Sequence, residues 1–168
     1  SDEFDAVSAH FTARNSHDEL VGSLRLVQPV NGAAFPFQDH CPSLFDNFVM
    51  PPHDQCGEIS RLVVRKSYRR RPGDNLAGVS QELIEHGLQG DLRTRPERRS
   101  RNPQILLGLY REMYRYSVQN GIRYWYAAME RSLARALSSF NFVFTPIGLQ
   151  TDYYGPVTPY MADLRELE

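Results

Sequence analysis

The sequence lacks any uninterrupted apolar run of the ~18 residues that a membrane-spanning helix needs, and its N-terminus shows no signal-peptide pattern. We therefore expect no membrane span and a cytoplasmic location. Cysteine is also scarce. Cys41 and Cys56 could form a disulfide, but in a reducing compartment the expectation is two free thiols. The five histidines are too scattered to match a metal-binding spacing, so no metal is predicted.

The composition is that of one globular domain. The 168 residues are 41% hydrophobic and 23% charged, enough to bury a core without disulfides. The net charge of −1 hides a basic segment, because eleven Lys or Arg and five Asp or Glu lie between Arg61 and Arg101. One basic segment on an otherwise acidic chain indicates a specific anionic partner rather than a nucleic acid. A nucleic-acid binder remains the alternative interpretation of the arginines, and it would bind with a steep salt dependence.

The apolar periodicity predicts an α+β domain with a mixed, mostly antiparallel sheet. Strands are expected over 6–14, 19–27, 58–65, 122–129, 140–149 and 157–164, and helices over 102–119 and 131–139. Residues 29–56 contain five prolines and read as a long insertion whose aromatic side chains cover the core or a pocket. Since helix 102–119 connects two strands, we expect one parallel crossover, between the strand of Glu58 and that of Tyr124.

Glu58 stands out because it begins a strand that leads into a cationic turn. In a regular strand Glu58 and Ser60 share one face, with Ile59 and Arg61 on the other. A carboxylate and a hydroxyl that face one cleft could bind and deprotonate an amine. The alternative is a strand-edge carboxylate paired with a nearby arginine.

The cationic turn itself, Arg69-Arg70-Arg71, suits an anion such as the phosphate of a pantetheine arm, although a charge run of this kind can also be only solvated. Arg25 lies within an apolar strand, where a buried arginine is normally paired. Arg61 is likewise expected to pair with an acidic residue, either Asp2 or Asp5, and so to order the site without touching substrate.

In their order along the chain, these segments resemble the GNAT acyltransferase fold and, within it, the acyl-homoserine-lactone synthases and their relatives. The relatives include N-acyl amino acid synthases and acyltransferases associated with PEP-CTERM exosortase systems. The resemblance rests on Glu58-Ile59-Ser60-Arg61, Val21-Gly22-Ser23-Leu24-Arg25-Leu26, Asp2-Glu3-Phe4-Asp5, and the turn from Met129 to Arg135. Two features depart from the family pattern. A lone Gly73 replaces the usual Gly-x-Gly of the phosphate loop, and the chain begins almost at the first hairpin.

The resemblance implies one αβα sandwich over residues 1–168, with insertions at 30–56 and 70–101 and the family's N-terminal elements missing from this numbering. It implies Glu58 and Ser60 as catalytic residues, and Arg61, Arg25, Asp2 and Asp5 as an ordering set. Backbone at Val63 or Val64 would bind the thioester carbonyl, and Arg69 to Arg71 the carrier phosphate. The aromatic residues of the later strands are core by default, and we expect the acyl chain in a slot between them, lined by Trp125, Tyr126, Phe142 and Phe144.

The expected function is transfer of a fatty acyl group from a carrier thioester to the amine of a small acceptor, such as an amino acid. No bound cofactor is expected; the co-substrate would be acyl-carrier protein, favoured by the wide cationic area, or acyl-CoA. Two alternatives stay open. One is a homoserine-lactone-type signal synthase that uses S-adenosylmethionine, and the other is a non-catalytic module that binds an acyl chain or its carrier.

Overall fold

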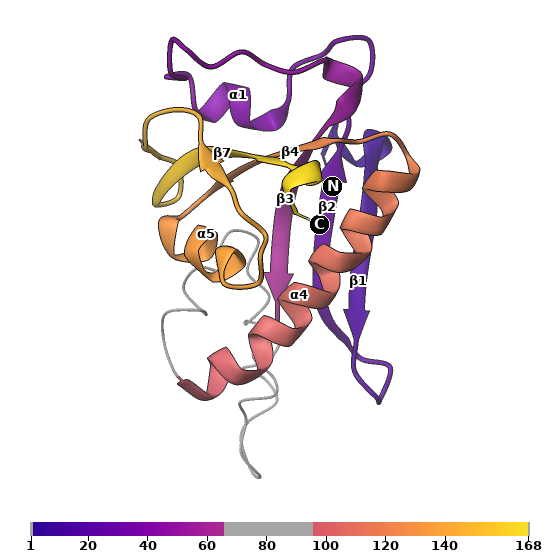
Figure 1. Ribbon diagram of the computed structural model, residues 1–168. Helices are drawn as coiled ribbons and strands as arrows, with labels where there is room; N and C mark the ends of the chain where they lie inside the picture. The colour runs from indigo at the N-terminus through magenta and orange to yellow at the C-terminus, as the bar shows by residue number, and fades with distance from the viewer. Residues whose placement is uncertain (1, 66–95, 168) are drawn as a thin grey trace.

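The computed structural model describes residues 2–65 and 96–167, with side chains from residue 103 onward in the second range (Figure 1). Most of the predicted insertion at 70–101 therefore lies outside the described residues. The strands are β1 (Ser8–Arg14), β2 (Leu20–Val27), β3 (Cys56–Val64), β4 (Tyr124–Met129), β5 (Thr145–Pro146), β6 (Thr151–Asp152) and β7 (Pro156–Asp163). The helices are α1 (Pro36–His40), α4 (Pro96–Gln119) and α5 (Arg131–Ser138), with short 3-10 turns at Asp5–Val7, His53–Gln55 and Leu164–Glu166.

The sheet confirms the predicted mixed topology. Its strand order is β1-β2-β3-β4-β7-β5, and β6 pairs with β7 off this path. All neighbouring pairs are antiparallel except β3 and β4, which run parallel. The parallel pair is the expected crossover, made by the chain segment that ends in α4. The predicted hairpin is present too, with β1 and β2 joined through the turn at 15–18.

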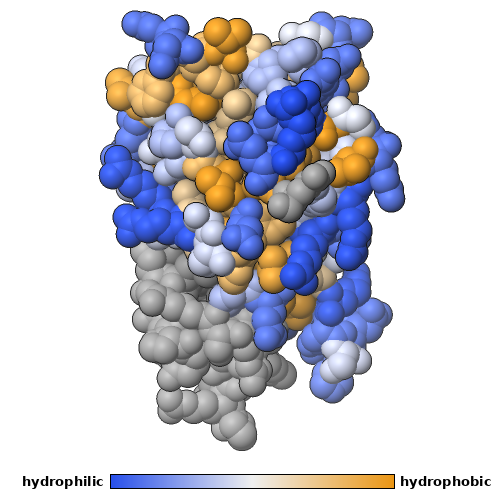
Figure 2. Space-filling view, in the orientation of Figure 1, coloured by the Kyte–Doolittle hydropathy of each residue, from blue (hydrophilic) through white to orange (hydrophobic). Residues whose placement is uncertain are grey.

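Two hydrophobic cores lie on opposite faces of this sheet. Trp125 and Tyr126 are consecutive in β4 and both fully buried, so they point to opposite faces. Trp125 packs into the larger core with α4 and α5, and Tyr126 into a smaller one with Phe35 and Phe37 of the 29–56 insertion. The insertion aromatics therefore cover part of the core, as expected. Figure 2 shows the face that carries α4, where hydrophilic residues cover much of the surface and apolar residues are visible between them and toward the top of the view.

Helix α4 crosses the larger core diagonally over β1, β2 and β3 (Figure 1). Its approach to β2 requires a glycine, because a Cβ at Gly22 would lie 2.8 Å from Cγ2 of Ile105. The helix begins at Pro96, not at the predicted Asn102-Pro103, and Pro103 lies inside it. A proline does mark the start of the helix, but it is Pro96 and not the predicted Pro103. Pro96 occupies the first helical position, where the missing N–H of a proline costs no hydrogen bond.

The predicted strand over 140–149 is wrong for its first half. Residues 140–142 instead close helix α5 in a Schellman motif, in which the N–H of Phe142 donates to the carbonyl of Leu137 and that of Asn141 to the carbonyl of Ser138. Asn141 has a φ of 71°, the left-handed conformation that this motif requires. The alternating phenylalanines therefore reflect packing against α4 and α5, and only Thr145–Pro146 pairs as a strand.

The structure also bears on the cysteines, on membrane-spanning helices and on metal sites. Both cysteines are free and buried, as predicted. Within the described ranges, no helix has the length and apolar character needed to cross a bilayer. Over the same residues, no three or more His, Cys, Asp or Glu side chains are grouped so that they could hold a metal ion.

Candidate active site

A cleft opens where β3 and β4 separate. The two strands pair only from Cys56 with Tyr124 to Glu58 with Tyr126, although β3 continues to Val64 and β4 to Met129. The separation follows from a bulge in β3. Arg25 pairs with Ser60 and Ser23 with Val63, so two β3 residues, Arg61 and Leu62, lie opposite the single residue Leu24. A bulge of this kind bends the strand that carries it.

The bulge also corrects the predicted side of Arg61. Regular alternation placed Arg61 with Ile59, on the core face. Arg61 instead has a φ of 53°, and its guanidinium reaches Asp2, which also pairs with Arg25. Leu62 returns to the large core beside Leu24. The extra residue thus moves Arg61 to the side of Ser60 and keeps the hydrophobic alternation intact beyond it.

The cleft encloses a cavity of about 190 Å³ that passes between the two strands. Its walls come from the N-terminal turn, β2, α1, β3, α4, β4, α5, β7 and the turn before β7. The lining residues are Asp2, Phe4, Arg25, Pro36, Phe37, His40, Glu58, Ile59, Ser60, Arg61, Leu62, Tyr110, Ala127, Ala128, Met129, Glu130, Leu133, Tyr153, Tyr154 and Val157. The predicted catalytic residues, Glu58 and Ser60, therefore both line the cavity. So do all members of the predicted ordering set except Asp5.

Glu58 is the most unusual group in the cavity wall. It is 4% exposed, and its Oε1 accepts a hydrogen bond from the Phe37 N–H at 2.8 Å. Among the described side chains, those of residues 2–65 and 103–167, it forms no ion pair. Burial raises the pKa of Glu58 to about 8, against the lowering effects of the Phe37 N–H and of the nearby Arg25 charge. A carboxylate with such a pKa can accept and return a proton near neutral pH.

Helix α1 positions the Phe37 N–H. Pro36 lies in the first turn, where a proline favours the start of a helix. The side-chain oxygen of Gln38 accepts a hydrogen bond from the N–H of Phe35 at 2.7 Å, and this bond fixes the start of the helix. The Phe37 ring packs 4.8 Å from that of Tyr126. This packing leaves the Phe37 N–H directed at the carboxylate instead of at solvent.

The predicted ordering set assembles around Arg25. Its guanidinium, which is 5% exposed, binds Asp2 at 2.7 Å and Asp5 at 2.9 Å, and its Nε donates to Oγ of Ser60 at 2.9 Å. The second expected pair, Arg61 with Asp2, is also present, at 2.8 Å. The N-terminal turn aims the acids, since the Phe4 N–H donates to Asp2 and the Asp2 N–H to Asp5. Ser60 is therefore held in place by a charge network two residues from Glu58.

The two acids of this network are held ionised. Burial acts to raise the pKa of Asp2, but hydrogen bonds from Arg25, the Phe4 N–H and Arg61 outweigh it and lower the pKa to about 2. The hydrogen bond from Arg25 lowers the pKa of Asp5, with a further contribution from the Asp2 N–H. The site thus holds carboxylates in two states near neutral pH: Asp2 and Asp5 in the Arg25 network stay ionised, and Glu58 can exchange its proton.

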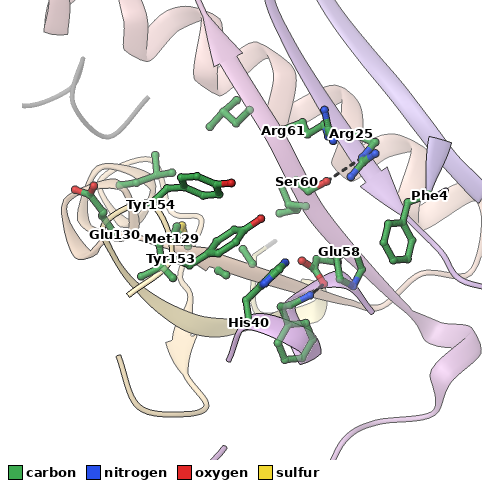
Figure 3. A pocket seen from close by; sticks show the side chains of 18 of the residues that line it. Phe4, Arg25, His40, Glu58, Ser60, Arg61, Met129, Glu130, Tyr153 and Tyr154 are labelled. Carbon is green, nitrogen blue, oxygen red and sulfur yellow. Dashed lines mark hydrogen bonds between the residues drawn. The ribbon is translucent and has the colours of Figure 1, made fainter. Parts of the chain in front are cut away.

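Three residues that the sequence did not single out form the wall opposite β3 (Figure 3). His40, from the end of α1, stacks on Tyr153 with ring centroids 3.8 Å apart, and Tyr153 meets Tyr154 edge-on at 4.8 Å. Both tyrosines belong to the turn between β6 and β7, in which Tyr154 and Gly155 have positive φ angles. Figure 3 shows the tyrosines projecting across the cleft toward β3. The Tyr-Tyr-Gly-Pro turn was visible in the sequence, but its position over the site was not.

The residues of the predicted acyl slot lie outside this cavity. None of Trp125, Tyr126, Phe142 and Phe144 lines the cavity; all four are packed in the cores on either face of the sheet. The indole N–H of Trp125 also donates a hydrogen bond to Oγ of the buried Ser117 at 3.0 Å. The residues that line the cavity from the large core are Ile59, Leu62, Tyr110, Ala127, Met129 and Leu133.

The predicted carrier-binding residues are only partly described. Arg69, Arg70 and Arg71 lie outside the described residues. Val64 is buried in the large core, and the side chain of Val63 faces a second, shallow cavity with Arg61. Since the β3–β4 ladder ends at Glu58, main-chain groups on the β4 side of the later β3 residues take no part in that ladder.

The raised pKa of Glu58 predicts how stability depends on pH. Because the folded-state pKa lies above the ordinary value of 4.5, Glu58 contributes most to stability below that value and loses the contribution as pH rises through about 8. Relative to Glu58→Gln, the native protein should therefore lose about 2–5 kcal/mol of unfolding free energy between pH 5 and pH 9. Urea denaturation of both proteins across this range measures the difference. A difference that does not change with pH would contradict a titrating, buried Glu58.

Comparisons with known proteins agree with this architecture. Residues 1–78 match the family model described as an acetyltransferase (GNAT) domain. No curated protein matches the chain in sequence. Among solved structures, BjaI, a CoA-dependent acyl-homoserine lactone synthase bound to SAM and isopentyl-CoA, superposes with a TM-score of 0.62 at 19% identity, over 99% of this chain and 64% of BjaI.

Two further structures share the arrangement. The acyl-homoserine-lactone synthase LasI matches with a TM-score of 0.63 at 15% identity, over 98% of this chain and 68% of LasI. FeeM, an N-acyl amino acid synthase from uncultured soil microbes, matches with a TM-score of 0.52 at 11% identity, over 96% of this chain and 75% of FeeM. The family match supports the predicted enzyme class, an N-acyltransferase. The chain therefore has the GNAT fold, with a mixed sheet split at the strand that carries Glu58.

Proposed function

We propose that this chain transfers a fatty acyl group from a carrier thioester directly to the amine of a small acceptor, with Glu58 as the general base. The observation that carries the proposal is the state of Glu58: buried, hydrogen-bonded only to a backbone N–H among the described residues, and open to a cavity between two separated strands. A structural carboxylate at that depth would be expected to have a cationic partner.

The chemistry of the cavity wall supports two substrate regions. The α1 side presents polar and aromatic groups, including Glu58, Ser60, His40 and Tyr153, and suits an amine-bearing acceptor. The α4 and α5 side is lined by residues of the large core, and it suits an alkyl chain. These residues are Ile59, Leu62, Tyr110, Ala127, Met129 and Leu133. A thioester lying between the two regions would have its carbonyl carbon beside Glu58.

In the proposed reaction the acceptor nitrogen attacks the thioester carbon and the carbon–sulfur bond breaks. Glu58 takes the proton that the amine loses and returns it to the departing thiolate, which leaves as the free thiol of the carrier. A main-chain N–H of β3 near Val63 or Val64 would stabilise the oxyanion that forms. Neither cysteine lines the cavity, which fits direct transfer without an acyl-enzyme. We assign the carrier phosphate to Arg69–Arg71, with acyl-carrier protein as the preferred donor and the cytoplasm as the place of reaction.

Mass spectrometry of lipid extracts tests the proposal before the acceptor has been identified. Cells that express the protein should accumulate a new N-acyl species that is absent from cells expressing Glu58→Gln at the same level. The mass of the new species would identify the acceptor and the chain length together. Two controls are needed: the protein purified from these cells must be folded, and the cells must contain abundant acyl carriers. If both conditions are met and expression leaves the lipid extract unchanged, the proposal is contradicted.

The second candidate is a signal synthase that uses S-adenosylmethionine, and the likeness to BjaI, which was solved with SAM, favours it. This candidate shares the acyl transfer but adds lactone formation, which releases methylthioadenosine. Incubation of the protein with an acyl thioester and S-adenosylmethionine separates the two. Methylthioadenosine release would favour the synthase, whereas N-acylation of an amino acid without it would favour the first proposal.

A further inference from the structure

The cavity reaches from one face of the sheet to the other. At the α1 face its wall includes Glu58 and His40, and at the α4 face it includes Leu133 from α5 and Tyr110 from α4. These last two residues belong to the large core, on the opposite side of the sheet from α1. The cavity therefore enters that core through the gap between β3 and β4, and Tyr110 is the largest apolar side chain that it meets there.

Tyr110 is fixed in this position. Its side chain is 1% exposed, and its ring packs edge-on against three other rings, with centroids 5.9 Å from Trp125, 5.5 Å from Phe142 and 6.4 Å from Phe144. Trp125 in turn stacks on Phe142 and Phe144. Close-packed rings of this kind leave little room for a side chain to move aside. Tyr110 thus separates the cavity from the aromatic cluster of Trp125, Phe142 and Phe144.

We propose that Tyr110 ends the acyl site and sets the maximum length of the chain that the protein accepts. The inference rests on the proposed function, because it takes the cavity as the place of the acyl chain. An alkyl chain that passes Leu62, Met129 and Leu133 would place its terminal methyl against the Tyr110 ring. Longer chains would have to displace a ring held by three others, so transfer should fall sharply beyond one length and not decline gradually.

The hydroxyl of Tyr110 makes the control variant simple. Within the described part of the chain this hydroxyl forms no hydrogen bond, so the ring alone acts as the barrier. Tyr110→Phe should therefore keep the length limit of the native protein. Tyr110→Leu keeps an apolar side chain at this position, but the leucine is shorter and leaves most of the volume of the ring empty. The limit should then move outward by roughly two to three carbons, because the space that the ring filled becomes available to the chain.

The experiment measures chain-length profiles with saturated acyl thioesters of even carbon number from butyryl to palmitoyl. Initial rates of transfer are measured for the native protein, Tyr110→Phe and Tyr110→Leu, and thermal-shift titrations with the same thioesters measure binding without turnover. Leu133→Phe provides an independent variant that should move the limit inward, because it narrows the same region from α5. This variant keeps the test informative if Tyr110→Leu does not fold.

The two readouts distinguish the failure of this inference from failure of the proposed function. A limit that shifts outward in Tyr110→Leu, inward in Leu133→Phe and not at all in Tyr110→Phe is the expected result. Profiles that are the same in all folded variants would overturn the role of Tyr110 and leave acyl transfer intact. Length-dependent binding that follows the variants, without transfer to any amine, would instead support the acyl site and contradict the proposed reaction.

Discussion

Glu58→Gln should lower the rate of acyl transfer by about 10²- to 10⁴-fold, the range that loss of a general base normally costs. The glutamine is nearly isosteric, and its side-chain oxygen can still accept the Phe37 N–H that now binds Glu58 at 2.8 Å. The fold and the cavity should therefore survive, and the loss should fall on the chemical step. Steady-state kinetics on the acceptor identified from lipid extracts measure it, with the decrease expected in kcat and little change in KM.

Glu130→Gln is the matched control for this experiment. Glu130 also lines the cavity, at the end of β4, but it is only partly buried and burial does not isolate it as it does Glu58. Its replacement should change the rate by less than about tenfold, since a partly solvated charge has a weaker field at the reacting atoms. Equal losses in both variants would mean that the cavity needs negative charge in general, and not a base at Glu58.

The pH dependence gives a second signature of the same residue. A general base must be ionised to act, and burial raises the pKa of Glu58 to about 8. The native kcat/KM should therefore rise with pH and level off above about 8, while the residual rate of Glu58→Gln should lack this rise. A native profile that is already level between pH 5 and pH 7 would exclude Glu58 as the base.

The sequence was sufficient to predict the parts of this site that follow from local pattern. Glu58 begins an apolar strand, and strand alternation placed Ser60 on the same face, as the structure has it. The pairing of Arg25 with the acidic N-terminal turn was also predictable. A buried guanidinium must find a carboxylate, and the acids at the start of the chain were its expected partners. The parallel pairing of β3 with β4 was predictable too, because a helix connects these two strands.

The remaining features depend on contacts between residues distant in sequence. The bulge that moves Arg61 to the side of Arg25 leaves no sequence signal, because Arg61 is not a glycine despite its φ of 53°. The hydrogen bond that holds Glu58 comes from a backbone N–H in an insertion without regular pattern. Periodicity marked Trp125, Phe142 and Phe144 as inward-facing, but it could not show that Tyr110 would lie between them and the cavity.

Arg25→Met should be the most destabilising single change in the site, with a loss of about 2–4 kcal/mol of unfolding free energy. The methionine can fill much of the buried volume, but it leaves Asp2, Asp5 and Ser60 without the donor that joins them. Because the two acids are about a third exposed, at 31% and 33%, water can solvate them in part and limit the cost. Activity should fall as well, since Ser60 would lose the bond that orients it beside Glu58.

Two further variants show whether the lost unfolding free energy comes from breaking the Arg25 network or only from losing a partly exposed charge. Arg61→Met removes the ion pair with Asp2, in which the two side chains are 33% and 31% exposed, and the loss of this pair should cost less than about 1 kcal/mol. Arg25→Met combined with Asp2→Asn and Asp5→Asn removes both signs of charge and should be more stable than Arg25→Met alone. If the triple variant is as unstable as the sum of its parts, the arginine acts through packing and not through its carboxylate partners.

Acid titration of the same proteins identifies the carboxylates involved. The pKa of Asp2 is lowered to about 2 and that of Asp5 is lowered as well, so both contribute stability above their ordinary range near pH 4 and lose it as pH falls toward 2. The native protein should therefore lose stability between pH 4 and pH 2 more steeply than Arg25→Met, in which both acids lose the hydrogen bond from Arg25 that helps to lower their pKa values. Parallel acid profiles for the two proteins would show that the arginine does not hold these acids ionised. The order of the site around Ser60 would then need another source.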